Sequence, residues 1–196
     1  MFNPHFWRGR SVFVTGHTGF KGSWLCLWLN LLGAKVSGYA LPAPTDPSLF
    51  ELARISETID HHVGDIRDLS ALEAALRHAQ PEVVIHMAAQ SLVRYSYAQP
   101  VETFSTNVMG TVHILDAVRR TPSVRSVVIV TSDKCYFNEE WVWGYREDSR
   151  LGGHDPYSGS KGAAELVVTA YQNSFFDKER NAGLAAVGSA RAGNVI

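Results

Sequence analysis

Short apolar runs rich in β-branched residues alternate along the chain with longer stretches in which apolar residues recur every three to four positions. The runs predict buried β-strands, and the recurring pattern predicts α-helices that pack on them. Strands are expected at residues 11–15, 35–39, 60–63, 83–89, 126–131 and 185–190. Helices are expected at residues 21–32, 48–53, 69–79, 100–120 and 157–175. This alternation is typical of a doubly wound parallel sheet, so we predict a three-layer, Rossmann-type α/β fold with strand order 3-2-1-4-5-6.

The first predicted strand runs directly into a glycine-rich turn, GHTGFKG at residues 16–22. We expect Gly16 to take the backbone angles of the turn, Gly19 to let a pyrophosphate approach the main chain, and Gly22 to let the helix lie close to the strand. The free N–H groups at the helix start would then face the phosphates of a dinucleotide. The predicted cofactor-binding residues of this turn are Gly16, His17, Gly19, Phe20, Lys21 and Gly22.

Two further strand ends bear on the cofactor. An acidic residue at the end of the second strand commonly binds the adenosine ribose of NAD, but here Ala40 stands at that place. The sequence therefore leaves NAD and NADP as alternatives. The fourth predicted strand ends in Ala88 and Ala89, whose small side chains leave space beside a cofactor.

A tyrosine and a lysine lie four residues apart in the last predicted helix, Tyr157 and Lys161. That spacing places them one turn apart on the same face, where the ammonium favours the phenolate over the phenol. Tyr157 is thereby suited to take a proton from a sugar hydroxyl. Ser132 ends the fifth strand at the edge where such sheets bind ligands, and we expect it to hydrogen-bond the same sugar oxygen.

These features together resemble the extended short-chain dehydrogenase/reductase superfamily. The glycine spacing is G-x-x-G-x-x-G, and Asn107 opens the segment N-V-M-G-T at residues 107–111. On its own Asn107 could be a solvated helix position; the resemblance implies that it supports the catalytic apparatus. Asp65 of the Asp65-Ile66 pair could be a simple turn cap, whereas the resemblance implies that it contacts the adenine amino group.

Within the superfamily, three segments resemble the cytidine-diphosphate-glucose 4,6-dehydratases, which are nucleotide-sugar enzymes of deoxysugar and lipopolysaccharide precursor synthesis. The segments are SDKCY at residues 132–136, EWVWGYRE at 140–147 and LGGHDPY at 151–157. Sister dehydratases carry Asp-Glu after the serine or threonine, so Asp133-Lys134 is a pattern of this family. Trp141 and Trp143 are either core residues or part of a lid over the sugar.

The resemblance implies an internal redox cycle on bound NAD. Tyr157 takes the proton of the sugar 4-hydroxyl as hydride passes to the nicotinamide, water then leaves across carbons 5 and 6, and hydride returns to carbon 6. Asp133, in its protonated form, is the expected acid for the leaving 6-hydroxyl. Lys134 is expected either to act as base at carbon 5 or to stabilise the developing enolate electrostatically. Asn194 matches an asparagine near the substrate diphosphate.

Residues 1–196 read as one NAD(P)-binding Rossmann domain. The resembled family continues with further strands and a carboxy-terminal sugar-nucleotide domain, so we expect the chain to be a fragment or a natural truncation. Two other functions stay open. A nucleotide-sugar 4-epimerase needs only Tyr157, Lys161, Ser132 and the cofactor, although Asp133 argues against it because an epimerase needs no acid for a departing hydroxyl. The other is a cofactor-binding module without turnover.

Composition narrows the class of protein. The chain is 45% hydrophobic and 19% charged with a formal net charge of −1, so nothing favours nucleic acid or an anionic membrane as a partner. Cys26 and Cys135 are the only cysteines, so we expect no disulfide framework and a cytoplasmic location. Apolar positions on the helices at 100–120 and 157–175, by analogy with related enzymes, predict a homodimer.

No metal site is predicted. His86 is interpreted as a hydrogen-bonded histidine at a strand end, since no further ligand lies at a metal-site spacing. The same interpretation covers His61 and His62.

Overall fold

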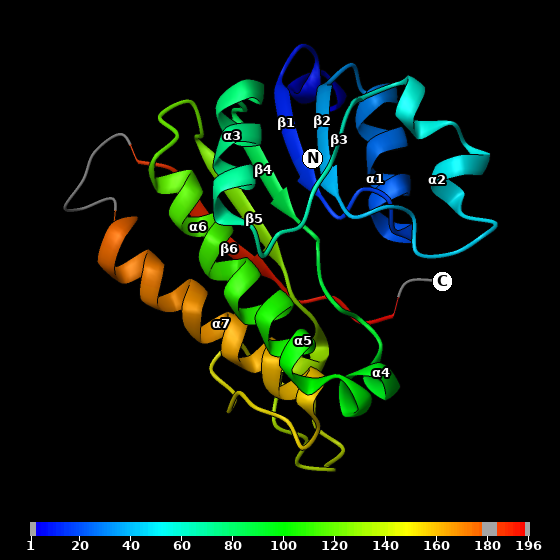
Figure 1. Cartoon of the computed structure of the whole chain (residues 1–196). Helices are drawn as coiled ribbons and strands as arrows, with labels where there is room; N and C mark the ends of the chain where they lie inside the picture. Colours follow the sequence, from blue (N-terminus) through cyan, green and yellow to red (C-terminus); the bar gives the residue numbers. More distant parts are fainter. Residues whose placement is uncertain (1–2, 178–183, 195–196) are drawn as a thin grey trace.

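The computed structural model describes residues 3–177 and 184–194. Its strands form one sheet in the order β3-β2-β1-β4-β5-β6, and every neighbouring pair is parallel (Figure 1). The predicted fold class and strand order are therefore confirmed. The strands are β1 (Ser11–Thr15), β2 (Lys35–Ala40), β3 (Asp60–Val63), β4 (Val83–His86), β5 (Ser126–Val130) and β6 (Ala186–Ala190).

Helices cover both faces of this sheet (Figure 1). The α-helices are α1 (Phe20–Leu31), α2 (Leu49–Leu52), α3 (Leu69–Ala79), α4 (Val93–Ala98), α5 (Pro100–Phe104), α6 (Gly110–Arg119) and α7 (Pro156–Phe175). Because successive strand residues point to opposite faces of the sheet, side chains of β1 pack in the hydrophobic cores on both faces. Phe13 packs in the core under α3, α6 and α7, whereas Val12 and Val14 pack in the core under α1 and α2.

Helix starts follow the expected capping chemistry. The hydroxyl of Ser48 accepts a hydrogen bond from the Glu51 N–H at 3.2 Å, and the carboxylate of Asp68 accepts one from the Ala71 N–H at 3.0 Å. Such side chains satisfy backbone donors that the first helical turn leaves free. Gly33, with φ of +80°, follows the end of α1, where the left-handed conformation favours glycine.

The predicted helix at residues 100–120 is interrupted by a π-helical turn. Helices α5 and α6 are joined by Ser105–Met109 in π-helical conformation. Helix α4 and three short 3₁₀ turns, Pro4–Trp7, Ile55–Glu57 and Asp133–Cys135, were not predicted. Segments of three to six residues are too short to display a helical period.

None of the helices in residues 3–177 and 184–194 combines the length and the apolar character that a transmembrane span needs. Cys26 and Cys135 are buried free thiols, as the sequence indicated. Burial raises the pKa of Cys26 to about 12 and that of Cys135 to about 11.

Candidate active site

A cavity of about 470 Å³ opens at the carboxyl edge of the sheet. Its size lies within the usual range for ligand pockets, and its place is the one where parallel α/β sheets bind ligands. Nearly all the predicted cofactor-binding residues line it. They are Gly16, Gly19, Phe20, Lys21, Gly22, Asp65, Ile66, Ala88, Ala89, Tyr157 and Lys161.

The three glycines of the turn have different roles. Gly16 has φ of +77°, and a Cβ there would lie 2.7 Å from the Ala88 nitrogen; a Cβ on Gly22 would lie 2.2 Å from the Gly16 oxygen. The fold itself therefore requires both. A Cβ on Gly19 would meet only the Gly16 oxygen, at an acceptable 3.4 Å. Gly19 begins α1 without a side-chain cap and faces the cavity, so its bare backbone is free for an anionic ligand.

His17 does not take its predicted place in the cavity wall. Its side chain is fully buried, and Nε2 shares a 2.7 Å hydrogen bond with Nδ1 of His61. Its ring lies edge-on to Phe50 and fills the space beside Gly38, where a Cβ would come within 2.5 Å. Burial and the neighbouring His61 lower the pKa of His17 to about 4. His17 thus supports the glycine turn by packing its neutral imidazole into the interior of the fold.

Both interpretations of Asp65 find support in its position. Its carboxylate accepts a hydrogen bond from the Arg67 backbone N–H at 2.8 Å and pairs with the Arg67 guanidinium at 2.6 Å. It therefore caps the turn, while it also lines the cavity. At the end of β2 the wall is made by Ala40, Leu41 and Pro42, so apolar side chains stand where an acidic one is common.

Asn107 is not a solvated position. It is buried in the π-helical turn, and its amide donates to the Gln90 oxygen at 2.9 Å and to the Ser160 hydroxyl at 2.8 Å. Its side-chain oxygen accepts from the Gln90 N–H at 2.8 Å. These bonds join the loop after β4 to helix α7, which carries Tyr157 and Lys161.

Helix α7 presents the tyrosine and lysine to the cavity while burying most of each side chain. Burial and the charge of Lys21 lower the pKa of Lys161 to about 8. His86 lies near this ammonium; burial first, and then Lys161, lower its pKa to about 3. Its Nδ1 shares a 2.7 Å hydrogen bond with the Thr15 hydroxyl, which confirms its interpretation as a satisfied strand-end histidine.

Ser132, Asp133 and Lys134 lie beside the cavity, in the turn that follows β5. Among the described residues that line the cavity, Thr131 is present but these three are not. The Ser132 hydroxyl donates to Asp133 Oδ1 at 3.0 Å and accepts from the Lys134 N–H at 3.1 Å. The Ser132 hydroxyl is therefore occupied as the cap of the turn.

Lys134 Nζ donates to Asp133 Oδ2 at 2.9 Å. Partial burial raises the pKa of Asp133, but hydrogen bonds from Lys134 and Ser132 outweigh it and hold that pKa below its usual value. The same hydrogen bond raises the pKa of Lys134. The expectation of a protonated Asp133 is thus corrected for this arrangement, in which Asp133 is ionised and the proton resides on Lys134.

A buried ion pair next to this turn was not predicted. Glu165 on α7 is 2% exposed and accepts hydrogen bonds from Arg191 at 2.9 Å, from Ser189 at 2.8 Å and from Thr131. Arg191 also donates to the Tyr136 hydroxyl at 2.7 Å. The pair therefore fastens β5, β6 and the Asp133–Cys135 turn to α7. Its only sequence signal is a charged residue within an apolar helical pattern.

The segment at residues 191–194 runs past the same turn. The Asp133 N–H donates to the Ala192 oxygen at 3.2 Å, and Asn194 follows as an exposed residue. Trp141 and Trp143 are 52% and 75% exposed, so their interpretation as core residues is wrong. A role in a lid stays a prediction.

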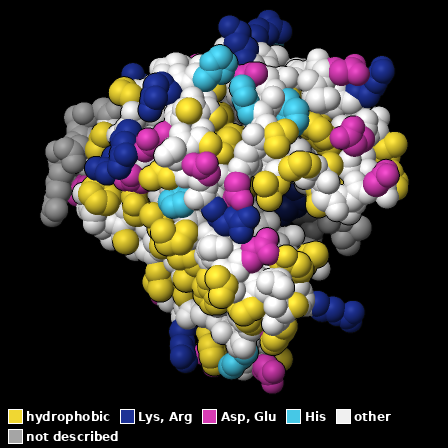
Figure 2. Space-filling view, viewed as in Figure 1, with side chains coloured by type: hydrophobic (Ala, Val, Ile, Leu, Met, Phe, Trp, Pro, Cys, Tyr) yellow, Lys and Arg dark blue, Asp and Glu magenta, His cyan; other side chains and the backbone are white. Residues whose placement is uncertain are grey.

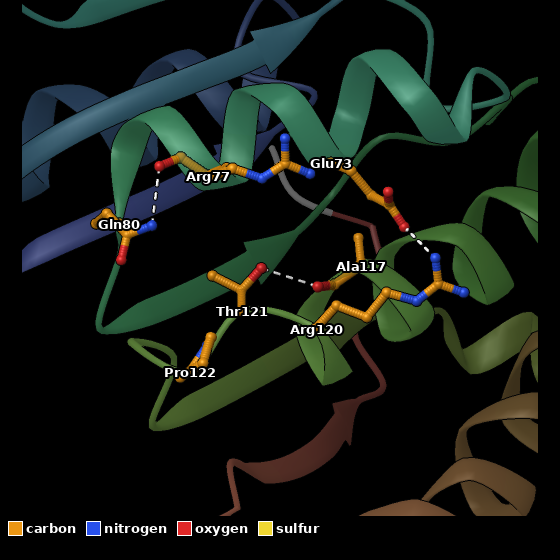
Figure 3. A pocket seen from close by; sticks show the side chains of 7 residues that line it. All are labelled: Glu73, Arg77, Gln80, Ala117, Arg120, Thr121 and Pro122. Atoms are coloured by element: carbon orange, nitrogen blue, oxygen red, sulfur yellow. Dashed lines mark hydrogen bonds and ion pairs between the residues drawn. The ribbon is translucent and has the colours of Figure 1, made fainter.

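A second cavity of about 220 Å³ lies between the ends of α3 and α6 (Figure 3). Its polar groups bind one another: Arg120 pairs with Glu73 at 2.8 Å, and the Gln80 amide donates to the Arg77 oxygen at 2.8 Å. The backbone oxygen of Gln80 accepts a hydrogen bond from the hydroxyl of Ser11, the first residue of β1. This cavity therefore lies at the amino edge of the sheet, opposite the glycine turn.

The chain matches the family model described as GDP-mannose 4,6 dehydratase over residues 13–182. It is 58% identical to a CDP-glucose 4,6-dehydratase of Salmonella typhimurium strain LT2, over 100% of this chain and 55% of that protein. It is 31% identical to a dTDP-glucose 4,6-dehydratase of Xanthomonas campestris pv. campestris, over 83% of this chain and 49% of that one. The chain thus spans about half the length of these relatives.

Solved structures agree with the fold. A UDP-glucose 4-epimerase from Brucella ovis in complex with NAD superposes with a TM-score of 0.74 at 25% identity, over 95% of this chain and 52% of that one. A UDP-glucose-4-epimerase from Stenotrophomonas maltophila, with bound NAD and formylated UDP-arabinopyranose, gives 0.78 at 24% identity, over 93% and 52%. The chain belongs to the GDP-mannose 4,6-dehydratase family of the extended short-chain dehydrogenase/reductase superfamily.

Proposed function

We propose that the protein is a lyase that converts CDP-D-glucose to CDP-4-dehydro-6-deoxy-D-glucose and water through an internal hydride cycle on bound NAD. The observation that carries the proposal is the meeting of Tyr157 and Lys161 with the glycine turn in one cavity, beside the Asp133–Lys134 pair. The 58% identity to the Salmonella CDP-glucose enzyme supports the choice of substrate.

The residues at the glycine turn fit a dinucleotide. Gly19 leaves its backbone open to the cavity, and the uncapped start of α1 provides N–H donors for a pyrophosphate. Asp65, which lines the same cavity, would accept a hydrogen bond from the adenine amino group. When bound, NAD supplies the hydride acceptor and donor, while the protein supplies orientation and electrostatics. NADP remains the alternative cofactor because Ala40 leaves no acidic side chain at the end of β2.

Tyr157 removes the proton of the sugar 4-hydroxyl. Lys161 is mostly protonated at neutral pH, since its pKa is about 8, and it lines the same cavity as Tyr157. Asn107 positions this pair through Ser160. Ser132 turns from Asp133 towards the sugar oxygen when substrate binds.

Asp133 and Lys134 act as one unit in the elimination of water. Together they carry a single proton, which rests on Lys134. Transfer of that proton along their 2.9 Å hydrogen bond makes Asp133 an acid for the leaving 6-hydroxyl and Lys134 a neutral base for the hydrogen at carbon 5. Without transfer, the Lys134 ammonium stabilises the enolate that forms next to the 4-ketone. A 4-epimerase has no use for this pair, which favours the dehydratase.

We also propose a cytoplasmic homodimer that serves lipopolysaccharide precursor synthesis. Large apolar side chains are exposed on α5, on the π-helical turn that follows it and on α7: Val101 at 81%, Leu166 at 61%, Met109 at 45% and Phe104 at 42%. Figure 2 shows hydrophobic side chains gathered over the lower half of this face, where α5 and α7 lie. A second copy that covers these side chains would remove them from water. Neither nucleic acid nor a membrane is proposed as a partner.

The test incubates the protein, expressed from its complete reading frame, with NAD and each of CDP-glucose, UDP-glucose and dTDP-glucose. We expect the 4-keto-6-deoxy product, identified by mass spectrometry as a loss of water, with CDP-glucose preferred. Inversion at carbon 4 without loss of water would make the protein an epimerase. Cofactor binding without conversion of any sugar would make it a binding module.

A further inference from the structure

Three potential metal ligands meet at the edge of the sheet farthest from β6. Asp60 and His62 are two residues apart on β3, so their side chains point to the same side of the strand. His78 comes from the last turn of α3. One ligand atom from each lies within 4.8 Å of the other two. Figure 2 shows histidine side chains grouped beside an acidic one in the upper part of this face, where α3 and β3 lie.

The spacing of these atoms suits a small divalent ion. Zinc bonds of about 2.0–2.2 Å to nitrogen and oxygen place tetrahedral ligands roughly 3.3–3.6 Å apart. Asp60 Oδ2 lies 2.8 Å from His62 Nε2 and 3.9 Å from His78 Nε2, so the observed distances bracket that value. The two imidazole rings meet edge to face with centroids 5.6 Å apart. Small side-chain rotations are therefore enough to close the set around an ion.

We propose that Asp60, His62 and His78 bind a divalent transition-metal ion of the zinc class. Two imidazoles and one carboxylate are ligands that such ions prefer, and water completes the coordination. The side chains are 47%, 32% and 70% exposed, so the ion enters from solvent without unfolding the chain. This proposal departs from the sequence-based expectation of no metal. That expectation weighed His62 by sequence spacing, and only the fold brings His78 to it.

The position of the site assigns it a structural role. Asp60 begins β3 and His78 lies in the last turn of α3, so both lie at the amino edge of the sheet, away from Tyr157 and Lys161. An ion there would tie the edge strand to the helix that follows it. Between the two strand ligands, His61 points to the opposite side and bonds His17 under the glycine turn. The ion would thus also stiffen the strand that supports this turn.

The experiment uses protein without an affinity tag, because a histidine tag would bind the same ions. Zinc chloride is titrated calorimetrically into the wild type and into the variants Asp60→Asn and His78→Gln, with His5→Gln as a control at an exposed histidine outside the cluster. We expect one strong zinc site per chain, weakened roughly tenfold or more in both cluster variants and unchanged in the control. Thermal unfolding measured in parallel should show zinc raising the Tm of the wild type and of His5→Gln, but not that of the two cluster variants.

Titration with cobalt chloride provides a second, spectroscopic measurement of metal binding. Co²⁺ bound by two imidazoles and a carboxylate absorbs visible light more strongly than hydrated Co²⁺ does. Excess zinc should displace the Co²⁺ and abolish this absorption. Absence of any stoichiometric site in the wild type overturns the proposal. Zinc binding that persists unchanged in the triple variant Asp60→Asn, His62→Gln, His78→Gln overturns it equally, because the ion would then be held elsewhere. Neither result depends on the proposed enzymatic activity.

Discussion

The side-chain amide of Asn107 donates a 2.8 Å hydrogen bond to the hydroxyl of Ser160. Ser160 lies between Tyr157 and Lys161 on α7, so this bond anchors the helical turn that carries the proposed catalytic pair. Asn107 in turn is held by the backbone of Gln90, in the loop that borders the cavity. The π-helical turn around Asn107 brings this amide to α7, in keeping with the frequent occurrence of such turns at functional sites.

Replacing Asn107 by alanine should therefore weaken both stability and turnover. The backbone N–H and oxygen of Gln90, which are partly buried, would lose their partner, and an unpaired polar group costs about 1–3 kcal/mol when it is buried. We expect the free energy of unfolding in urea to fall by about 2–3 kcal/mol and kcat to fall more than KM changes. Ser105→Ala in the same turn is the control, since among the residues that the structure describes its hydroxyl bonds only the Glu102 backbone oxygen, three residues back. Equal effects in the two variants would count against a positioning role for Asn107.

Two variants in the glycine turn should distinguish an effect on NAD affinity from an effect on the stability of the fold. Gly19→Val adds a side chain on the open side of the turn, where a ligand pyrophosphate is expected, so NAD affinity should be lost while the Tm stays close to that of the wild type. Gly22→Ala should instead lower the Tm, because its Cβ would collide with the Gly16 oxygen and destabilise the fold. Calorimetric NAD titration and thermal unfolding measure the two quantities. Unchanged NAD affinity in the Gly19 variant would refute the proposed cradle.

Lys161 predicts a dependence of stability on pH. Its pKa in the folded chain is about 8, below the ordinary 10.5, so the unfolded chain binds more protons between these values and stability rises with pH there. Below pH 8 both states are charged and the burial penalty is fully present. Lys161→Met should thus stabilise the cofactor-free protein at pH 7, by at most about 3 kcal/mol, while abolishing turnover. At pH 10 the gain should shrink.

Urea unfolding at pH 7 and pH 10 tests this prediction. Lys35→Met is the matched control, since Lys35 is exposed at the start of β2. The control should show no comparable gain at either pH. A Lys161→Met variant that is less stable than the wild type at pH 7 would mean that the ammonium is stabilised by its surroundings rather than penalised by burial.

Sequence patterns predicted the central strands β1 and β4 well because most of their residues are apolar and most are buried. The glycine turn was also predicted, since it depends on residues that are neighbours in the chain. Features that depend only on residues close together in the chain can be predicted without a structure. The same holds for the four-residue spacing of Tyr157 and Lys161.

Contacts between distant residues could not be predicted in this way. The partners of Asn107, the Glu165–Arg191 pair and the approach of His78 to Asp60 depend on how the topology folds segments together. The burial of His17 is set by Gly38 and Phe50 on other elements, so the local motif wrongly placed it at the ligand. The pKa shifts of Asp133 and Lys134 depend on whether their side chains pair or separate, which sequence adjacency leaves open.

The proposed dimer predicts a clean difference between two leucine variants. Leu166 on α7 is 61% exposed and Leu31 on α1 is 85% exposed, so glutamate at either position should leave the monomer folded. Only Leu166→Glu places a charge in the proposed interface, and burying it there would be costly. Light scattering at micromolar concentration should therefore report a dimer for the wild type and for Leu31→Glu, and a monomer for Leu166→Glu. A monomeric wild type would rule out the dimer.

In the proposed mechanism, the elimination of water requires Lys134, whereas the first hydride transfer does not. Lys134→Met removes the proton that the pair would deliver to the 6-hydroxyl and the charge that would stabilise the enolate, but it leaves Tyr157 and Lys161 in place. We expect loss of the 4-keto-6-deoxy product, with the first hydride transfer still visible as transient absorbance of reduced cofactor. Lys134→Arg is the informative control, because a guanidinium keeps the charge but cannot act as a base. Partial activity in Lys134→Arg would assign the lysine to electrostatic stabilisation, and its complete loss would assign it to proton transfer. If Lys134→Met released product at the wild-type rate, the pair would have no catalytic role, and a 4,6-dehydratase mechanism would have to place its acid elsewhere in the site.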